Sequence, residues 1–427
     1  MNMLRALRYT AAVAIMAAVG LFFVFSVFPL PSNPDVAPVD SELSAEALQH
    51  ARELMVVAEP AIDSSKERYR PLPPETGKFR VPESLRPVVD FWKRLYTGLY
   101  SFQAVIHDNL DVTRVYGIVD LRNEPGMKRG DYDSTREAAL DVLDRYKKNL
   151  RYLLTRNYNP DTLSGERKRL HLLIVNNGGK KAFRGSVERM RVQRGLRDVY
   201  AQSIARSGRY LEEYRRIFRE QGVPEELTLL PHVESSYLFN AHSYAGAVGI
   251  WQITRVASAR LLKVNTVVDE RIDPWRSAEA AARILATNYR SLKSWPLAVT
   301  AYNQGLGAMR RAVRQLGTRD IGEVVQRYRG RSFGFVGRNF YCAFVAAVEV
   351  VHEHEEYFGR IHFDEPVKLV RHKLTKSAPL NSIAEEFGVD TNTLSDLNPH
   401  LRRPAHTSRA RIPRGAVINL PADTAIN

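Results

Sequence analysis

One glutamate, Glu234, lies among small, aromatic and amide residues near the middle of the chain. Residues 243–252 follow it with two glycines, a tryptophan and a glutamine, and residues 301–305 add a tyrosine and two amides. A cleft that cleaves saccharides needs a proton donor, a closely approaching backbone, stacking faces and groups that hydrogen-bond to hydroxyls. These segments supply each of them and predict a site that acts on a polysaccharide.

The helical pattern before Glu234 explains how its carboxyl group could act as an acid. Residues 225–234 are largely apolar, and burial at the end of such a helix raises the pKa of a carboxyl group. A glycosidic oxygen leaves readily only after it receives a proton, so we predict Glu234 as the catalytic acid. The alternative is a structural glutamate bonded to Ser235 or to backbone amides; in the catalytic interpretation Ser235 belongs to the substrate-binding group.

The two later segments contain groups that could hold a sugar. Gly249 would allow close approach to a ligand, and Trp251 would offer an apolar face for a pyranose ring. Gln252 could both donate to and accept from an acetamido group, and Tyr302 and Asn303 could orient the sugar or shape the charge around the acid. The alternative for the glycines and Trp251 is a tight turn packed on a core tryptophan.

Length and composition bound the kind of protein that carries these groups. A chain of 427 residues, 44% hydrophobic and 26% charged, suits two or three globular domains. Its formal net charge of +15 favours adsorption to a polyanion such as nucleic acid, anionic lipid or an acidic cell wall. Residues 189–219 are rich in arginine but match no nucleic-acid-binding module, so we expect no nucleic-acid partner. The single cysteine, Cys342, lies in an apolar run and is expected in the core.

The N-terminal residues predict delivery to a membrane. Arg5 and Arg8 precede an uncharged apolar stretch, residues 11–30, which is long enough to span a bilayer as a helix. We therefore expect residues 1–31 to be an anchor in the inner membrane, with the remainder facing the periplasm. The alternative is a cleaved signal and a soluble periplasmic protein. Residues 32–86, rich in proline and polar groups, are expected to form an extended tether.

Hydrophobic periodicity divides the remaining chain into three parts and predicts a mostly α protein. Residues 87–196 are expected to form a helical accessory region, and residues 197–360 a helical catalytic domain. Residues 365–423 are expected to form a small βααβ module. Within the catalytic domain the expected helices are residues 225–234, 252–262, 274–292, 296–303, 307–316, 321–328 and 338–357, with Thr254, Asp273 and Ser294 at N-cap or turn positions.

The order of the motifs resembles a known family. E-S at 234–235, S-x-x-G-A-x-G-x-x-Q at 243–252 and A-Y-N-x-G at 301–305, with residues 268–274 between them, resemble the soluble lytic transglycosylase domain. That family is related in fold to goose-type lysozyme, so a lysozyme-like helical domain is implied. Residues 205–210 are similar to the membrane-bound type D members. The resemblance places the catalytic Glu at Glu234 and substrate contacts at Ser243, Gln252, Tyr302 and Asn303.

The resemblance also implies a reaction without water. Glu234 would protonate the β-1,4 glycosidic oxygen between N-acetylmuramic acid and N-acetylglucosamine in peptidoglycan glycan strands. The carboxylate would then take the proton of the muramoyl C6 hydroxyl, which closes on C1 to give a 1,6-anhydro product. No metal and no cofactor are implied, and cell-wall synthesis or division proteins are the protein partners that this activity suggests.

Two alternatives keep the same fold, and one of them depends on other carboxylates. Asp269, Glu270 and Asp273 lie later in the chain, so a hydrolytic muramidase with paired carboxylates stays open. We expect Asp269 and Asp273 to be structural, through helix capping and pairing with Arg271. The other alternative is a non-catalytic wall-binding protein.

Two positions depart from the family pattern. Trp251 stands where the family usually has Met, and type D relatives share this Trp. Val336 stands where many members have a Glu that shapes the site. We therefore expect Glu234 to be the main acidic group of the site.

The C-terminal part resembles a LysM module, a small βααβ binder of glycans that contain N-acetylglucosamine. The resemblance rests on residues 382–389, 397–399, 411–413 and 418–421. Residues 377–379 replace the usual Gly-Asp-Thr near the first strand. The resemblance implies that this module binds the glycan strand.

Overall fold

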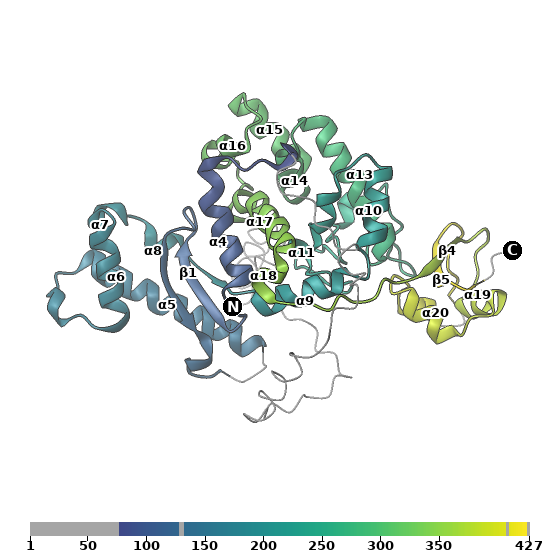
Figure 1. Cartoon of the computed structure of the whole chain (residues 1–427), viewed down its shortest axis with the longest axis horizontal. Helices are drawn as coiled ribbons and strands as arrows, with labels where there is room; N and C mark the ends of the chain where they lie inside the picture. The colour runs from purple at the N-terminus through teal and green to yellow at the C-terminus, as the bar shows by residue number, and fades with distance from the viewer. Residues whose placement is uncertain (1–76, 128–131, 407–409, 425–427) are drawn as a thin grey trace, which may run out of the picture.

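The computed structural model describes residues 77–127, 132–406 and 410–424. These residues are mostly helical and form a central helical body with a smaller region at each end (Figure 1). The expected anchor and the tether up to residue 76 lie outside the described residues. Within the described ranges, no helix combines the length and the apolar character that crossing a membrane requires.

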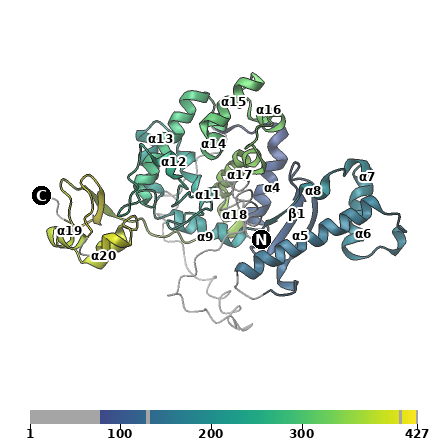
Figure 2. The same ribbon diagram turned by 180° about the vertical axis from the view of Figure 1, so that it is seen from behind.

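The central body contains the expected catalytic domain, and its helices surround α17 (Figures 1 and 2). Its elements, in which η denotes a 3₁₀ helix, are α9 (Arg197–Ser207), α10 (Leu211–Glu220), η5 (Glu225–Leu229), α11 (Pro231–Glu234), α12 (Arg255–Ser258), α13 (Pro274–Leu292), α14 (Trp295–Gln304), α15 (Leu306–Leu316), α16 (Ile321–Arg327), α17 (Phe335–His352) and α18 (His354–Phe358).

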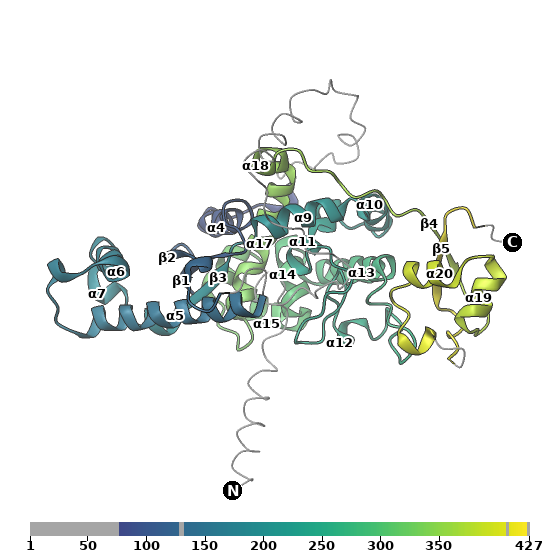
Figure 3. The same cartoon turned by 90° about the horizontal axis from the view of Figure 1, so that it is seen from below.

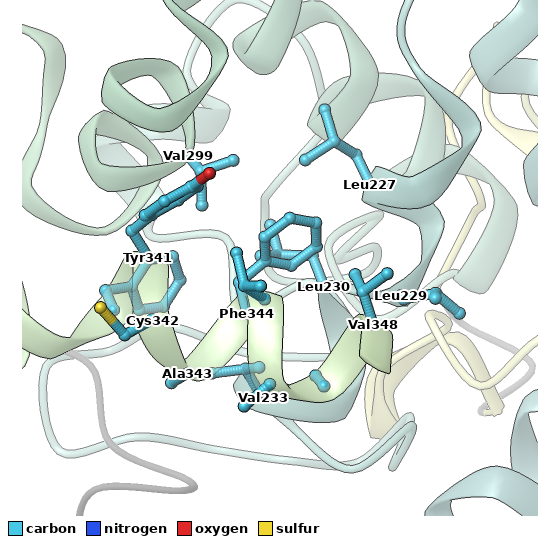
Figure 4. Packing of buried hydrophobic residues seen from close by; sticks show 14 of the residues in the cluster. Leu227, Leu229, Leu230, Val233, Val299, Tyr341, Cys342, Ala343, Phe344 and Val348 are labelled. Carbon is cyan, nitrogen blue, oxygen red and sulfur yellow. The ribbon is translucent and has the colours of Figure 1, made fainter. Parts of the chain in front are cut away.

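Helix α17 is the centre of the core. All of its residues except Arg338 and His352 are buried, as expected of a helix that is apolar on every side. Phe344 of α17 packs in one cluster with Leu230, the N-cap residue of α11, and with Val233 inside α11 (Figure 4). The short segment that ends at Glu234 is therefore seated directly on the core helix.

Side-chain caps explain where two of the catalytic-domain helices begin. Asp273 Oδ1 accepts hydrogen bonds from the backbone N–H of Trp275 and Arg276 and starts α13. Thr254 caps α12 in the same way. Ser294 occupies the N-cap position of α14 without a side-chain cap bond.

One expected helix is much shorter than predicted. The pattern of residues 252–262 indicated a helix, but only α12 forms there. Gln252 has a positive φ of 46°, and Ile253 forms a β-bridge with Val248, so the backbone enters this region in a non-helical conformation.

The core of the catalytic domain also includes residues that precede it in the chain. They form η1 (Gly77–Phe79), η2 (Glu83–Leu85) and α4 (Arg86–Thr97), so residues 77–86 are not the extended tether that was expected. Helix α4 packs against α17: Trp92 Nε1 donates to Asn339 Oδ1 at 3.2 Å, and Tyr96 OH donates to the Ala343 carbonyl at 3.3 Å. Its buried face, with Val89, Trp92, Leu95 and Tyr96, is part of the same core.

The accessory region is not purely helical, which corrects the sequence-based expectation. An antiparallel sheet of order β2-β1-β3 is formed by β1 (Gln103–Asp108), β2 (Val115–Asp120) and β3 (Met190–Arg194). The long helix α5 runs beside it (Figure 3). The helices and turns here are η3 (Leu121–Asn123), α5 (Tyr132–Thr155), η4 (Pro160–Thr162), α6 (Gly165–Asn176), α7 (Gly179–Ala182) and α8 (Ser186–Arg189). The central strand β1 is buried on both faces, so its residues lack the alternation that identifies a strand in sequence.

The C-terminal module has the expected βααβ order. Strands β4 (Leu369–Lys373) and β5 (Val417–Pro421) pair antiparallel, and α19 (Leu380–Phe387), α20 (Thr391–Leu397) and η6 (Arg403–His406) lie between them in the chain. The module has its own apolar core, to which Val268 of the catalytic domain contributes.

Candidate active site

Glu234 ends α11 in an almost fully buried position. Its side chain is 3% exposed, and its Oε1 atom has no hydrogen-bond partner among the described residues. Burial raises the pKa of Glu234 to about 8, because the apolar surroundings disfavour the charged form. The carboxyl group is therefore mostly protonated at neutral pH, which is the state that the predicted role as an acid requires.

The turn after Glu234 is held in an unusual conformation. Ser236 and Tyr237 have φ values of 54° and 60°, which are uncommon for residues other than glycine. Tyr237 OH donates to the Thr228 carbonyl at 2.5 Å, and Arg206 Nε donates to the Ser236 carbonyl at 2.9 Å. These bonds fix the turn and thereby the direction in which the helix end presents Glu234.

Ser235 joins the glutamate to the second motif. Its hydroxyl is fully buried and donates to the Ile250 carbonyl at 2.7 Å. This bond connects the end of α11 to the loop of residues 241–253. The structure thus places the Ser235 side chain against protein backbone, whereas the sequence suggested a contact with substrate.

The loop of residues 241–253 folds on itself through backbone bonds. Ser243 Oγ accepts from the Ala247 N–H at 3.0 Å, and Gly249 N–H donates to the Ala241 carbonyl at 2.8 Å. Gly249 has a φ of 78°, and a Cβ atom there would lie 2.2 Å from the Arg271 carbonyl oxygen. Glycine is therefore required at this position by packing against residue 271, and the close approach to a ligand stays a prediction.

Gln252 ends this loop with a buried amide that points toward the turn. Its side chain is 2% exposed, and Nε2 donates to the Gly249 carbonyl at 2.9 Å and to the Ala241 carbonyl at 3.2 Å. Its Oε1 atom has no partner among the described residues. The amide is thus oriented by the loop and retains one free acceptor.

The third motif reaches the same place from the C-terminal end of α14. Tyr302 OH donates to the Trp251 carbonyl at 2.7 Å. Burial, and then the negative charge of Glu234, raise the pKa of Tyr302 well above its ordinary value. Asn303 is 8% exposed; its Oδ1 accepts from Gln304, and its Nδ2 has no partner among the described residues. The structure therefore links all three predicted motifs at residues 250–252.

Trp251 does not offer a face to a sugar, which corrects the prediction. Its side chain is fully buried, and its ring lies 5.2 Å from the rings of Phe218 and Tyr214. Its carbonyl group accepts the hydrogen bond from Tyr302. The alternative of a tight turn packed on a core tryptophan is the one that the structure supports.

Each of the other carboxylates near the motifs has a structural partner, although Glu270 Oε1 has none among the described residues. Asp269 pairs with Arg271 at 2.8 Å, and Asp273 caps α13, as expected. Glu270 Oε2 accepts from the Lys263 N–H at 2.7 Å. Val336, where the family resemblance implied a Glu in many members, is largely buried in the first turn of α17. These positions leave Glu234 as the acidic group that the three motifs surround.

Arg271 is a support of the site that the sequence did not identify beyond its pairing with Asp269. Its Nη1 atom donates to the Gly246 carbonyl at 2.9 Å and to the Ile253 carbonyl at 3.4 Å, near the two ends of the glycine-containing turn. The signal in the sequence is an arginine between acidic residues, but this signal is common on protein surfaces. Only its burial, with 5% of the residue exposed, distinguishes it.

A cavity of about 810 Å³ lies elsewhere on the catalytic domain, at the N-terminal end of α14, where Lys293, Trp295 and Arg319 line it. Tyr302 and Asn303 stand at the opposite end of that helix. Among the described residues, no group of three or more His, Cys, Asp or Glu side chains could hold a metal ion.

Comparison with known proteins agrees with this geometry. Residues 216–325 match the family model of the transglycosylase SLT domain. Glu234, the glycine-containing loop and the Tyr302 motif all lie within the matched range.

The chain is similar to curated proteins over part of its length. Membrane-bound lytic murein transglycosylase D of Escherichia coli (strain K12) is 27% identical over 190 residues, which are 42% of this chain and 40% of that protein. The protein of the same name from Escherichia coli O6:H1 matches to the same extent. The matched part thus spans about two fifths of the length of these relatives.

Proposed function

We propose that this protein is a lytic transglycosylase that cleaves the β-1,4 bond between N-acetylmuramic acid and N-acetylglucosamine in peptidoglycan. The observation that carries the proposal is the buried carboxyl group of Glu234, with its pKa raised to about 8 and its Oε1 without a partner in the described part of the chain. The transglycosylase SLT domain and the similarity to the transglycosylase D proteins of Escherichia coli support it.

In the proposed first step Glu234 donates its proton to the glycosidic oxygen. The bond between muramoyl C1 and that oxygen breaks, and the departing sugar leaves with a neutral hydroxyl. Because burial disfavours the carboxylate that results, Glu234 is at this point a stronger base than an ordinary carboxylate.

In the second step the Glu234 carboxylate takes the proton of the muramoyl C6 hydroxyl. The C6 oxygen forms a bond to C1 and gives the 1,6-anhydro ring, and Glu234 returns to its protonated state. One residue thus serves as acid and then as base, and no water is consumed. The structural commitments of Asp269, Glu270 and Asp273 support this single-carboxylate route over a paired-carboxylate one.

Two further atoms that lack a partner within the described ranges support a polar saccharide as the substrate. Gln252 Oε1 is a buried acceptor, and Asn303 Nδ2 is a buried donor. A buried polar atom without a partner is costly, and hydroxyl or acetamido groups of a bound glycan would satisfy both atoms. We assign Ser243, Gln252, Tyr302 and Asn303 to substrate binding, with Gly249 and Trp251 contributing through their backbone.

The remaining parts of the chain suggest where the protein works. The apolar residues 11–30 after Arg5 and Arg8 support an inner-membrane anchor with the enzyme in the periplasm. The net charge of +15 suits an acidic wall polymer, and the βααβ module of residues 365–423 is proposed to bind glycan.

The decisive experiment is digestion of purified peptidoglycan by the chain that lacks residues 1–30. We expect muropeptides that end in 1,6-anhydromuramic acid, and no such products with Glu234→Gln. Products heavier by one water would instead show a hydrolytic muramidase. Retained binding to peptidoglycan with no product from the parent protein would show a non-catalytic wall-binding protein.

A further inference from the structure

The C-terminal module contacts residues 263–273 of the catalytic domain, and Arg371 of β4 adds ion pairs to Glu279 of α13 and Glu213 of α10. Asp269 N–H donates to the His400 carbonyl at 2.8 Å, and Arg402 N–H donates to the Val267 carbonyl at 2.9 Å. Val268 and Leu401 form an antiparallel β-bridge between these two bonds. The backbones of the two parts therefore pair in the manner of a short sheet.

The same segment contributes to the core of the module. Val268 is fully buried among apolar residues of the module, which include Leu374, Ile383, Leu401 and Ile412. A side chain of the catalytic domain thus completes the apolar core of the neighbouring part. Movement of the module away from this segment would expose that core to water, which opposes such movement.

A buried carboxylate lies between an arginine of the module and an arginine of the catalytic domain. Asp269 is fully buried; its Oδ2 lies 2.5 Å from Arg402 Nη2 and 2.8 Å from Arg271 Nη2. Burial acts to raise the pKa of Asp269, but the hydrogen bonds from Arg271 and Arg402 outweigh it and lower that pKa. Because an unpaired charge is costly in this setting, the carboxylate keeps both arginines in place.

Arg271 continues this connection into the loop of residues 241–253, here called the catalytic loop. Its guanidinium donates to the Gly246 carbonyl at 2.9 Å, while its own carbonyl oxygen packs so closely on Gly249 that no Cβ atom would fit. These two contacts flank the turn that orients Gln252. The position of Arg271 therefore determines the position of the loop that carries Gln252, whose side-chain amide is proposed to bind substrate.

A second connection reaches the start of α13. Asn419 Nδ2 of the module donates to Asp273 Oδ2 at 3.0 Å, and His400 Nδ1 lies 3.2 Å from the same oxygen. The other oxygen of Asp273 caps α13. Both connections therefore meet the catalytic domain in the segment that supports its loop.

We propose that the C-terminal module positions the catalytic loop, with Arg402 as the positioning residue that acts through Asp269 and Arg271. This inference rests on the proposed function, and it gives the module a role besides glycan binding. Without Arg402 the Asp269 carboxylate loses its support from the module, and the loop that Arg271 holds becomes less well ordered. Since small displacements of groups that orient substrate are costly, kcat should fall about tenfold while KM changes little.

The test compares Arg402→Ala with Arg403→Ala in the chain that lacks residues 1–30. Arg403 is exposed on the same module and has no ion pair or hydrogen bond in the described structure. Arg403→Ala therefore removes one positive charge, as Arg402→Ala does, without removing such a contact. The measurements are kcat and KM for release of anhydromuropeptides, and co-sedimentation with insoluble peptidoglycan. We expect a fall in kcat for Arg402→Ala alone, unchanged sedimentation, and partial recovery with Arg402→Lys. Equal kcat for all variants, or a loss confined to KM and sedimentation, would overturn the proposal.

Hydrogen exchange provides a readout that does not depend on activity. The N–H groups of Gly249 and Gln252 are hydrogen-bonded inside the loop, and they should exchange faster in Arg402→Ala, while amides of α17 keep their protection. Unchanged exchange at the loop, or equal loss of protection in α17, would contradict the proposal. If the parent protein forms no anhydro product, the proposed function fails, whereas the exchange experiment still decides whether Arg402 orders the loop.

Discussion

Glu234 combines features that seldom occur together in one side chain. It is buried, its Oε1 has no partner among the described residues, and it is the last residue of a short helix seated on the core. A buried carboxyl group of this kind destabilises the fold but is suited to proton transfer near neutral pH. Its properties lead to two predictions at the scale of the residue.

Replacing Glu234 with Gln should remove activity and stabilise the protein. Product formation should fall by at least about a hundredfold, the usual contribution of a general acid. At pH 7 the free energy of unfolding should increase by up to about 3 kcal/mol, because the unfolded state no longer gains by ionising this group. Urea unfolding and mass analysis of muropeptides measure the two effects; lower stability of the Gln variant would contradict the pKa of about 8.

The pH dependence should follow the same pKa. The rate of cleavage should fall as the pH rises above about 8, because Glu234 loses its proton in the free enzyme. The pKa is higher in the folded than in the unfolded state, so the stability due to this group is complete below about pH 4 and is lost up to pH 8. The stability difference between the parent and Glu234→Gln should therefore grow over this interval and then level off.

At the scale of elements, the catalytic loop depends on two glycines with different surroundings. Gly246 and Gly249 both have positive φ, of 75° and 78°. A Cβ atom at Gly246 would meet nothing within 4 Å, whereas one at Gly249 would lie 2.2 Å from the Arg271 carbonyl. The pair therefore separates backbone strain from steric overlap.

The two alanine variants should differ in stability. Gly246→Ala should cost about 1–2 kcal/mol, the usual penalty of the left-handed conformation for alanine. Gly249→Ala should cost about 1–3 kcal/mol more, because the segment around Arg271 must move to admit the methyl group. Urea unfolding of both variants measures the difference, and activity should be lost more severely in Gly249→Ala. Equal destabilisation would show that Arg271 moves away freely.

At the scale of the whole molecule, the catalytic core is assembled from distant parts of the chain. Helix α4 precedes the accessory sheet, yet it packs against α17 at the centre of the catalytic domain (Figure 1). Arg86 and Lys93 on this helix both pair with Glu349 of α17. The accessory region is thus inserted between two segments that share one core.

This arrangement predicts the outcome of truncation. The fragment of residues 77–427 should fold, whereas residues 197–427 should not form a stable domain, because the loss of α4 exposes the face of α17 that Trp92 and Tyr96 cover. Each such side chain contributes about 1.5–3 kcal/mol through burial, so the total approaches the stability of a typical domain. Circular dichroism and thermal unfolding of the two fragments provide the comparison. A cooperative transition in the shorter fragment would show that α4 is dispensable.

Much of the catalytic domain is predictable because its helices are bounded by local signals. Asp273 with Pro274 marks the start of α13, and the expected range 274–292 agrees with the observed helix. The order of the C-terminal elements is equally evident from local pattern. The accessory strands were missed because β1, buried on both faces, has no alternation to distinguish it from a buried helix.

The sequence by itself predicted Glu234 as the acid and indicated the motifs that meet near it, since Glu234, Gln252 and Tyr302 belong to types and spacings suited to this chemistry. Only the tertiary structure decided which side chains face the site. It turned Trp251 into the core, directed Ser235 to the Ile250 carbonyl and placed Arg271 between the loop and the C-terminal module. The reason is physical: local pattern records the period of an element, whereas burial and pairing depend on contacts between segments far apart in the chain.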